Sequence, residues 1–291
     1  MVRVGRCIVM FDVGEGCQEA YGLFGLGMNK PLHIFISHSH GDHLLGLRPF
    51  LESLSLSRRE RCVHLYMPAY TRDYALSGVA EYGFPLHVTE IAGERGHIRL
   101  DECGVSVAYR LVPHSFLSYA FSLETDVKVK LNPVKLAADG IRGPQRRILL
   151  EKGAVSAGGG EVYLDYYVAA REPGIKITYS GDTLPAYQLA ALARNSDVLI
   201  HEATLLTKDW ESRPEVPHST PHYAAKTALL SRSRLLVLFH IGSRYEDPSP
   251  LLREALKVFP RVVLAERGMC IRVVQGRPRI YYITRGFRRI D

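Results

Sequence analysis

The chain has 291 residues, of which 46% are hydrophobic and 23% charged, an ordinary balance for a globular protein with a sizeable core. No apolar run approaches the ~20 residues that a membrane-spanning helix needs, and the run from Cys7 to Phe11 is too short for a signal peptide. The formal net charge of +7 favours an anionic partner, such as nucleic acid, a phosphorylated substrate or a membrane surface.

The cysteine pattern argues against a disulfide scaffold and against a zinc ribbon. The five cysteines are Cys7, Cys17, Cys62, Cys103 and Cys270. Their number is odd, their spacing is wide and no C-x-x-C pair occurs. We therefore expect buried free thiols in a reducing compartment, and a soluble cytoplasmic protein.

Runs rich in β-branched and other apolar residues predict strands along the whole chain. Examples, in chain order, are Arg6–Phe11, Leu32–Ile36, Val105–Leu111, Ile175–Tyr179, Asp197–Ile200, Leu235–Phe239, Arg261–Leu264 and Ile280–Ile283. The strands come in clusters with helical patterns between some of them, without strict alternation. This order predicts an α/β or α+β protein whose sheets are not purely parallel.

Three helices are predicted between these strands. The first carries Leu44, Leu47, Leu51 and Leu54 on one face. The second begins near Ser219-Thr220-Pro221, where Thr220 suits the N-cap and proline suits the first turn. The third runs from Pro250 to Phe259.

The stretch Asn132–Gly160 looks least like a protein core. It contains Gly140, Gly143 and Pro144, a basic pair at Arg146 and Arg147, and a run of glycines at its end. We interpret it as an insertion or mobile arm rather than as a linker between two domains.

The segment Ser37–His43 is the strongest functional signal in the chain. It places His38, His40, Asp42 and His43 at a predicted junction between a strand and a helix. Residues i and i+2 of an extended segment point the same way, so His38 and His40 can face one metal ion. The following turn directs Asp42 and His43 to a neighbouring position. Imidazole and carboxylate groups at such a junction suit zinc, manganese or iron.

A binuclear centre needs further ligands from distant parts of the chain. The candidates are histidines and aspartates that follow apolar runs, because strand ends often line active sites. His114 follows Arg110–Pro113, Asp182 follows the strand that ends at Tyr179, and His240 follows Leu235–Phe239.

These motifs resemble a known enzyme family. The segment Phe35–Gly46 is similar to the H-x-H-x-D-H signature of the metallo-β-lactamase superfamily, and the wider set resembles ribonuclease Z, which removes the 3′ trailer of precursor tRNA. The matching elements, in the order of that family, are F-D-x-G-E-G-x-Q at Phe11–Gln18, H-x-H-G-D-H-x-x-G at His38–Gly46, H-x-x-x-S-Y at His114–Tyr119, G-D-T at Gly181–Thr183, H-E-A-T at His201–Thr204, H-S-T at His218–Thr220 and an element close to H-F-S-x-R-Y at His240–Tyr245.

The resemblance implies an α/β (α+β) protein with a metallo-β-lactamase-like four-layer αβ/βα sandwich. Residues 1–291 would form a single domain with a basic, exosite-like arm inserted at about 131–160. The arm would grip precursor tRNA through phosphate contacts, and the family usually works as a homodimer in which one subunit's arm serves the other's site. No membrane partner is expected.

The resemblance also implies roles for individual residues. Two divalent ions per chain would bind, with zinc as the first expectation and manganese or iron also suited to the ligands. The first ion would be held by His38, His40 and His114, the second by Asp42, His43 and His240, and Asp182 would bridge both. Such a pair of ions would generate hydroxide from water at neutral pH. Asp42 would orient or deprotonate the attacking water, and His218, supported by Glu202, would protonate the leaving oxygen or stabilise the transition state.

The chain departs from the family's pattern in three places. Only about ten residues precede Phe11, where the family has a strand and a glycine-rich loop, so either the start codon is misassigned or that strand is lost, and its loss would expose a sheet edge. The arm has Gly-Ile-Arg-Gly-Pro in place of a more proline-rich form, and Ile241-Gly242 replaces the usual Phe-Ser. These changes concern grip on the substrate more than metal binding.

Two alternatives remain open from the sequence. The first is an enzyme of the same fold that hydrolyses small phosphodiesters or sulfate esters. The second is an RNA-binding protein that has kept the fold and lost catalysis. The arm at about 131–160 bears on the first, and the complete set of predicted metal ligands argues against the second.

Overall fold

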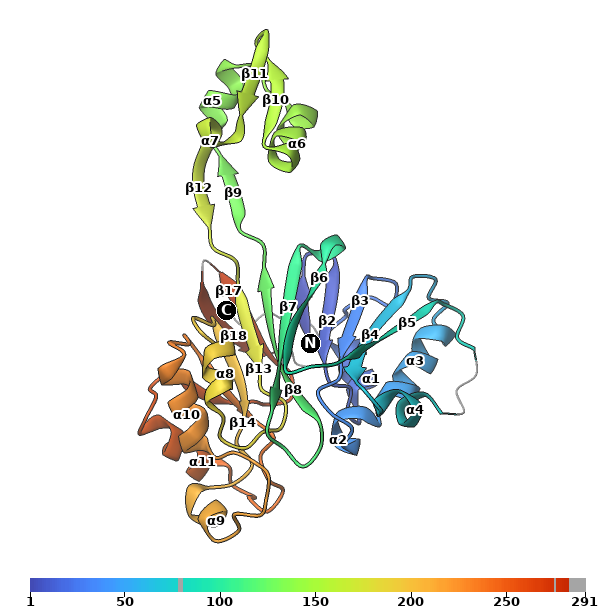
Figure 1. The fold of residues 1–291 in the computed structure, drawn as a ribbon, viewed down its shortest axis with the longest axis vertical. Helices are drawn as coiled ribbons and strands as arrows, with labels where there is room; N and C mark the ends of the chain where they lie inside the picture. Colours follow the sequence, from blue (N-terminus) through green and yellow to red (C-terminus); the bar gives the residue numbers. More distant parts are fainter. Residues whose placement is uncertain (78–80, 275, 283–291) are drawn as a thin grey trace. The chain divides into compact units, whose positions relative to one another are not determined.

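The computed structural model describes residues 1–77, 81–274 and 276–282 (Figure 1). The chain divides into two compact units, one made of residues 1–125 and 175–291 and the other of residues 126–174. The first unit carries all of the predicted metal ligands. Within the described residues, no helix is both long enough and apolar enough to cross a membrane. The last predicted strand lies at β18 (Arg277–Tyr282), and its final residue, Ile283, is outside the described residues.

The first sheet of the larger unit has five strands in the order β1-β2-β3-β4-β5. They are β1 (Val2–Val4), β2 (Cys7–Phe11), β3 (Leu32–Phe35), β4 (Val63–Pro68) and β5 (Leu86–Ile91). Strands β2 to β5 are parallel, whereas β1 pairs antiparallel with β2. Loss of the family's first strand was expected to expose a sheet edge. In the structure, β1 (Val2–Val4) pairs with β2 at that edge.

The second sheet has seven strands in the order β16-β15-β14-β13-β8-β7-β6. They are β6 (Arg95–Leu100), β7 (Val105–Val112), β8 (Ser118–Thr125), β13 (Lys176–Tyr179), β14 (Val198–Glu202), β15 (Leu236–Phe239) and β16 (Val262–Leu264). Strands β13 to β16 are parallel and β6, β7, β8 and β13 are antiparallel neighbours. The prediction of sheets that are not purely parallel is confirmed.

Two outer helical layers cover the two sheets. Helices α1 (Cys17–Leu23) and α3 (Leu47–Leu56) bury side chains such as Tyr21 and Phe50 against the first sheet. Helices α10 (Pro221–Leu230) and α11 (Ser249–Leu256) bury alanines against the second. Between the sheets, aromatic residues such as Phe35 and Phe121 pack together. The arrangement is the four-layer αβ/βα sandwich that the resemblance implied (Figure 1).

Shorter elements complete the larger unit. They are α2 (Gly41–Leu44), α4 (Thr71–Leu76), a 3₁₀ turn (Asp101–Cys103), α8 (Tyr187–Leu192), α9 (Thr207–Glu211) and the hairpin of β17 (Met269–Val274) with β18. Helix α10 begins as predicted, since the Thr220 hydroxyl accepts a hydrogen bond from the backbone N–H of Tyr223.

The predicted helix through Leu44 and Leu54 is interrupted at Gly46, which separates α2 from α3. The Gly46 N–H donates to the Val13 carbonyl, and a Cβ on Gly46 would lie 2.0 Å from the Gly14 carbonyl oxygen. The loop that follows β2 therefore occupies the space that a side chain at position 46 would need. All four predicted leucines of this segment are nevertheless buried in one cluster.

The expectation that all cysteines are free thiols is wrong, because a disulfide joins Cys7 to Cys103. Cys7 begins β2 in the first sheet, and Cys103 follows β6 of the second, 96 residues away. Their proximity depends on the packing of the two sheets, which no local pattern reports. Cys17, Cys62 and Cys270 are free thiols.

Residues 126–174 form the smaller unit, which extends beyond the expected arm at about 131–160. Its elements are β9 (Lys128–Leu131), α5 (Pro133–Ala138), α6 (Gly143–Lys152), β10 (Ala154–Ala157), β11 (Gly160–Tyr163), α7 (Leu164–Tyr167) and β12 (Val168–Glu172). Leu136, Leu149 and Tyr167 are buried in a small core of its own. The sequence did not reveal this core, because its few apolar residues are spread over several short elements.

Candidate metal centre

Seven predicted ligands lie in segments that follow strands of the two facing sheets. The segment after β3 holds His38, His40, Asp42 and His43, of which the last two lie in the short helix α2. Strand β7 ends just before the loop that carries His114, and β15 ends just before His240. Asp182 likewise follows β13. The packing of the two sheets brings these loops to a common place.

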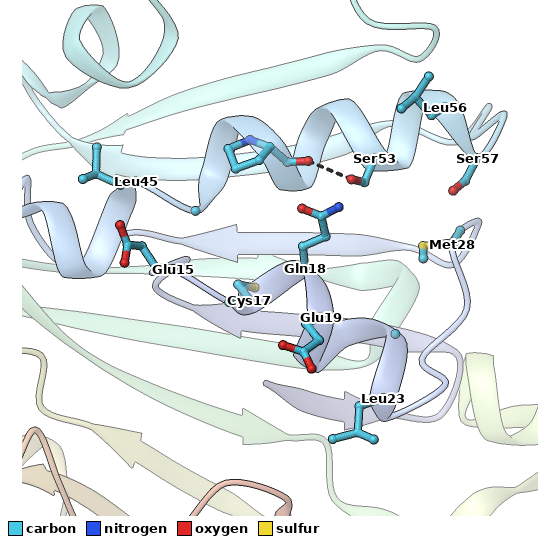
Figure 2. Close-up of a pocket in the computed structure, with 14 residues that line it drawn as sticks. Glu15, Cys17, Gln18, Glu19, Leu23, Met28, Leu45, Ser53, Leu56 and Ser57 are labelled. Atoms are coloured by element: carbon cyan, nitrogen blue, oxygen red, sulfur yellow. Dashed lines mark hydrogen bonds between the residues drawn. The ribbon is translucent and has the colours of Figure 1, made fainter. Parts of the chain in front are cut away.

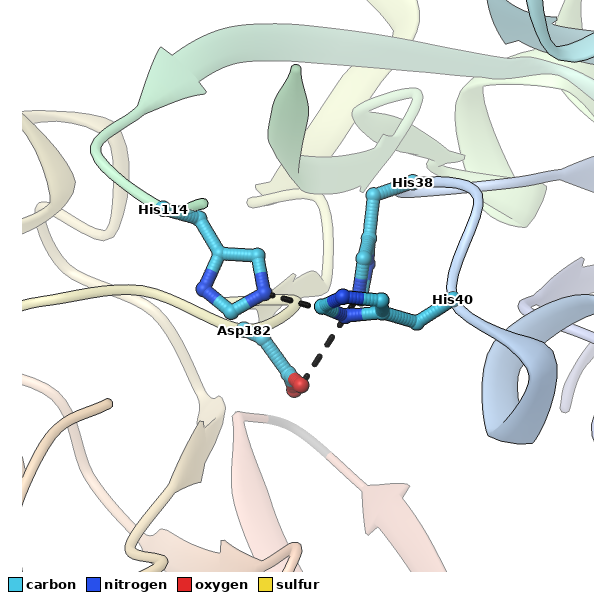
Figure 3. Close-up of side chains that lie close together, drawn as sticks. All are labelled: His38, His40, His114 and Asp182. Atoms are coloured by element: carbon cyan, nitrogen blue, oxygen red, sulfur yellow. Dashed lines mark hydrogen bonds and ion pairs between the residues drawn. The ribbon is translucent and has the colours of Figure 1, made fainter. Parts of the chain in front are cut away.

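The first cluster consists of His38, His40, His114 and Asp182, whose ligand atoms all lie within 4.8 Å of one another. His40 Nδ1 is 2.9 Å from His38 Nε2 and 3.2 Å from His114 Nε2. Asp182 Oδ2 lies 3.8 Å from His38 Nε2. Figure 3 shows the three imidazoles and the carboxylate converging, with His38 and His40 on one loop and with His114 and Asp182 on segments of their own.

The second cluster consists of Asp42, His43, Asp182 and His240, again with all ligand atoms within 4.8 Å. Asp182 Oδ2 is 3.3 Å from His43 Nε2 and 3.2 Å from His240 Nε2. His240 Nε2 is also 3.0 Å from Asp42 Oδ2. Asp182 therefore belongs to both clusters, in the place expected for a bridging ligand.

The residues present fit divalent cations. Among the described residues, His43 Nε2 and Asp182 Oδ1 are buried polar atoms without a hydrogen-bond partner. Buried polar atoms are almost always satisfied, so two such atoms in one His/Asp cluster indicate a ligand that the protein itself does not supply. Nitrogen and carboxylate donors in these numbers are the ligands that zinc, manganese and iron accept.

The electrostatics of the second cluster also fit a cation. Burial opposes a charge on His43, but Asp12 and Asp182 outweigh it and raise the pKa of His43 to about 11. Burial would raise the pKa of Asp182, yet the surrounding histidines hold it well below its usual value. The cluster thus favours one added positive charge, and a metal ion can provide that charge in place of a proton.

Asp12 positions His43 and was missing from the predicted site. Its Oδ2 lies 2.7 Å from His43 Nδ1 and accepts a hydrogen bond from the Tyr179 hydroxyl at 2.6 Å, while Oδ1 accepts one from the Ser37 N–H at 2.6 Å. Burial acts to raise the pKa of Asp12, but the His43 charge and these hydrogen bonds hold it below its usual value. Its signal in the sequence is the F-D-x-G-E-G-x-Q element, in which Asp12 is the acidic residue after the strand.

Other histidines are held through the ring nitrogen that faces away from the clusters. His114 Nδ1 lies 2.8 Å from the Pro217 carbonyl, and His38 Nδ1 lies 2.9 Å from Ser37 Oγ. His240 Nδ1 lies 2.8 Å from Thr204 Oγ1. Such outer contacts orient the imidazole and fix its tautomer, so that the inner nitrogen remains available to a metal. His240 also has φ of 53°, an unusual backbone angle for a residue with a side chain.

His218 and Glu202 lie beside the two clusters. His218 Nδ1 is 3.1 Å from Glu202 Oε1 and 3.8 Å from Asp182 Oδ2. Burial would lower the pKa of His218, but the Glu202 carboxylate outweighs burial and raises it above the ordinary value. Glu202 is fully buried and is itself held by the Thr183 N–H and the Thr204 hydroxyl. The pair can hold a proton next to the metal ligands.

A separate hollow of about 920 Å³ lies between α1 and α3 (Figure 2). Its lining includes Glu15, Gln18 and Ser53. Among the residues that the structure describes, none of the predicted metal ligands lines it. The hollow therefore gives no support to the metal chemistry, which depends on the convergence of side chains described above.

Comparison with known proteins assigns the fold to a class. A family model described as the metallo-beta-lactamase superfamily matches residues 1–125, and a model described as the beta-lactamase superfamily domain matches residues 156–241. The structure of the short form of human tRNase Z is similar with a TM-score of 0.63, at 23% identity, over 97% of this chain and 91% of that one. The protein is a member of the metallo-β-lactamase superfamily, whose members bind divalent metal ions.

Curated relatives define the particular family. Ribonuclease Z of Thermococcus onnurineus is 36% identical over 245 residues, covering 82% of this chain and 76% of the relative. Ribonuclease Z of Archaeoglobus fulgidus is 34% identical over 94% of this chain and 90% of the relative. The chain belongs to the ribonuclease Z family.

Proposed function

We propose that the chain is a metal-dependent endoribonuclease that removes the 3′ trailer of precursor tRNA by hydrolysis of one phosphodiester bond. The observation that carries this proposal is the pair of His/Asp clusters sharing Asp182, with the His218–Glu202 pair next to them. Membership of the ribonuclease Z family supports the substrate.

We further propose two divalent ions per chain, with zinc as the expected metal. His38, His40 and His114 would hold one ion, Asp42, His43 and His240 the other, and Asp182 both. When bound, such a pair of ions lowers the pKa of water in the site and offsets the negative charge that develops on the phosphoryl oxygens.

The protein's own groups then act on the water and on the leaving oxygen. Asp42 has a side chain that is 60% exposed, so it can meet solvent, orient the attacking water and accept its proton. His218 uses Nδ1 for the Glu202 contact, which leaves Nε2 to donate a proton to the leaving oxygen. The raised pKa of His218 favours the protonated form that this step requires.

The smaller unit would bind the body of the tRNA. Its exposed cations include Lys128, Arg142, Arg146 and Lys152. Contacts of this kind attach to phosphates without reading sequence. We also propose that the protein acts as a homodimer in which one subunit's smaller unit serves the other's metal centre. Light scattering would contradict the dimer if it gave the mass of a monomer.

The test is cleavage of a 3′-extended precursor tRNA by purified protein, with zinc or manganese added back after chelation. We expect one cut near the discriminator base, lost on chelation, restored by metal and absent in the Asp42→Ala variant. Absence of the cut, together with metal-dependent hydrolysis of a small phosphodiester by the same preparation, would overturn the tRNA substrate and favour the small-ester enzyme.

A further inference from the structure

A third group of metal-binding side chains lies at the opposite end of the first sheet. It consists of Cys62, His64 and His87, whose Sγ and imidazole nitrogen atoms lie within 4.8 Å of one another. His33, two residues into β3, is the neighbour of His64, whereas the catalytic cluster begins at His38 beyond the end of that strand. Five residues of extended chain span ~16 Å, so the two groups are separate.

The strand register brings the three side chains together. In the parallel pairing of β4 with β5, His64 lies directly opposite His87. Cys62 precedes β4 and lies two residues before His64, so in extended chain both side chains leave the same face of the sheet. This convergence is set by the pairing of two strands and is independent of the catalytic loops.

The position of the group allows a metal ion to enter. Strand β5 is the edge of its sheet, and the exposure of the side chains rises from His33, which is buried, through His64 and Cys62, which are partly buried, to His87, which is exposed. The group therefore has a packed inner side and an outer side open to water.

The inner side is organised around His64. The His33 ring stacks on the His64 ring with centroids 4.8 Å apart, and His33 is itself held near Glu102 by a contact of 3.2 Å. Burial and the neighbouring His87 hold the pKa of His64 below its ordinary value, so its imidazole is neutral and has a lone pair to offer at neutral pH. The Cys62 thiol contacts the Val63 carbonyl at 3.4 Å. Burial raises the pKa of Cys62, although the thiol is also hydrogen-bonded to the His87 backbone, which acts in the opposite direction and favours the thiolate.

We propose that Cys62, His64 and His87 bind one zinc ion per chain, with solvent as the fourth ligand. Thiolate and imidazole ligands lie about 2.0–2.3 Å from zinc, so tetrahedral ligand atoms are roughly 3.5 Å apart. Small rotations of exposed and half-exposed side chains close the observed separations to that value. Binding would link edge strand β5 to β4, and the thiolate sets this site apart from the catalytic clusters, which contain only nitrogen and oxygen ligands.

Cobalt substitution of the full-length protein tests this proposal. A thiolate bound to Co²⁺ gives a charge-transfer band in the near ultraviolet that imidazole and carboxylate ligands cannot give. The titration is done anaerobically and without added thiol, so that the Cys7–Cys103 disulfide stays closed. We expect the band in the wild-type protein and its loss in Cys62→Ser, with zinc content lower by about one equivalent per chain in that variant.

The matched controls are the other free thiols, changed by Cys17→Ser and Cys270→Ser, which should keep the band. His87→Ala, at an exposed position, should weaken the cobalt affinity measured from the band by about 10- to 100-fold. A wild-type protein without the band, a band that survives Cys62→Ser, or a cobalt affinity that is unchanged in His87→Ala would overturn the site. Cleavage of precursor tRNA should be unchanged in Cys62→Ser, so failure of the two proposals can be distinguished.

Discussion

Asp182 is the predicted ligand that belongs to both His/Asp clusters. It is buried, shares Oδ2 among His38, His43 and His240, and leaves Oδ1 without a hydrogen-bond partner among the described residues. Its neighbour Asp42 is exposed and contacts only the second cluster. The two carboxylates are therefore suited to different tasks, Asp182 to joining the metal positions and Asp42 to meeting the water that attacks the substrate.

Asp42→Ala is expected to abolish turnover and leave the fold intact, because the exposed carboxylate contributes to chemistry and little to packing. Single-turnover cleavage of precursor tRNA measures the first effect and urea unfolding the second. A variant that keeps near wild-type activity would refute the role assigned to Asp42.

His218→Ala is expected to slow cleavage by about 10²-fold, the usual contribution of one positioned general acid. The loss should fall on kcat rather than KM, since the proposed role of His218, which lies beside Glu202 and Asp182, is in proton transfer and not in substrate binding. Single-turnover rates at saturating protein provide the measurement, and a rate equal to that of the wild type would exclude His218 from proton transfer. Glu202→Gln should show a smaller loss in the same direction, because it removes the charge that favours protonated His218.

At the scale of elements, the metal centre depends on contact between two loops. The loop after β2 runs against the start of α2, where the Val13 N–H donates to the His43 carbonyl. Gly14 is a glycine because a Cβ there would lie 2.0 Å from the Asp42 carbonyl oxygen. This close approach places Asp12, which orients His43, beside the loop that carries the ligands.

Gly14→Ala is expected to destabilise the protein by about 1–3 kcal/mol, the usual cost of overpacking, and to weaken metal binding because the ligand loop must move. Urea unfolding and metal titration measure the two effects. The control is Gly22→Ala in α1, where an added Cβ meets no described atom within 4 Å, so helix propensity makes the change neutral or favourable. Equal behaviour of the two variants would show that the loops do not depend on this contact.

At the scale of the whole molecule, the smaller unit is inserted at the end of an antiparallel pair. Glu124 of β8 lies opposite Lys176 of β13, and the Thr125 N–H donates to the Ile175 carbonyl at 3.0 Å. The chain thus leaves and re-enters the larger unit at neighbouring positions. A two-residue Asn-Gly turn can close such a pair directly.

Replacement of residues 126–174 by Asn-Gly is expected to leave the sandwich folded and the hydrolysis of a small phosphodiester intact. Cleavage of precursor tRNA should fall by about 10²-fold or more, and its dependence on salt should become weaker, because phosphate contacts are lost. Circular dichroism and kcat/KM for both substrates provide the measurement. Unchanged cleavage of the tRNA would show that the smaller unit does not bind it.

Local patterns in the sequence determined much of this protein. Periodicity, capping and the two-residue repeat of extended chain act within short segments. They indicated the predicted strands, the start of α10 at Thr220 and the candidate ligand motif from His38 to His43. His114, Asp182 and His240 were candidates because each follows a recognisable strand, and the structure places each of them in a cluster with residues of that motif.

Only the tertiary structure decided the features that depend on contacts between distant segments. The Cys7–Cys103 disulfide needs the two sheets to face each other, the break at Gly46 needs the carbonyl of Gly14, and the grouping of His64 with His87 needs the register of two strands. A residue's local pattern reports which way its side chain points within its own element. It does not report which other element is packed against it, because that is settled by burial of apolar surface over the whole chain.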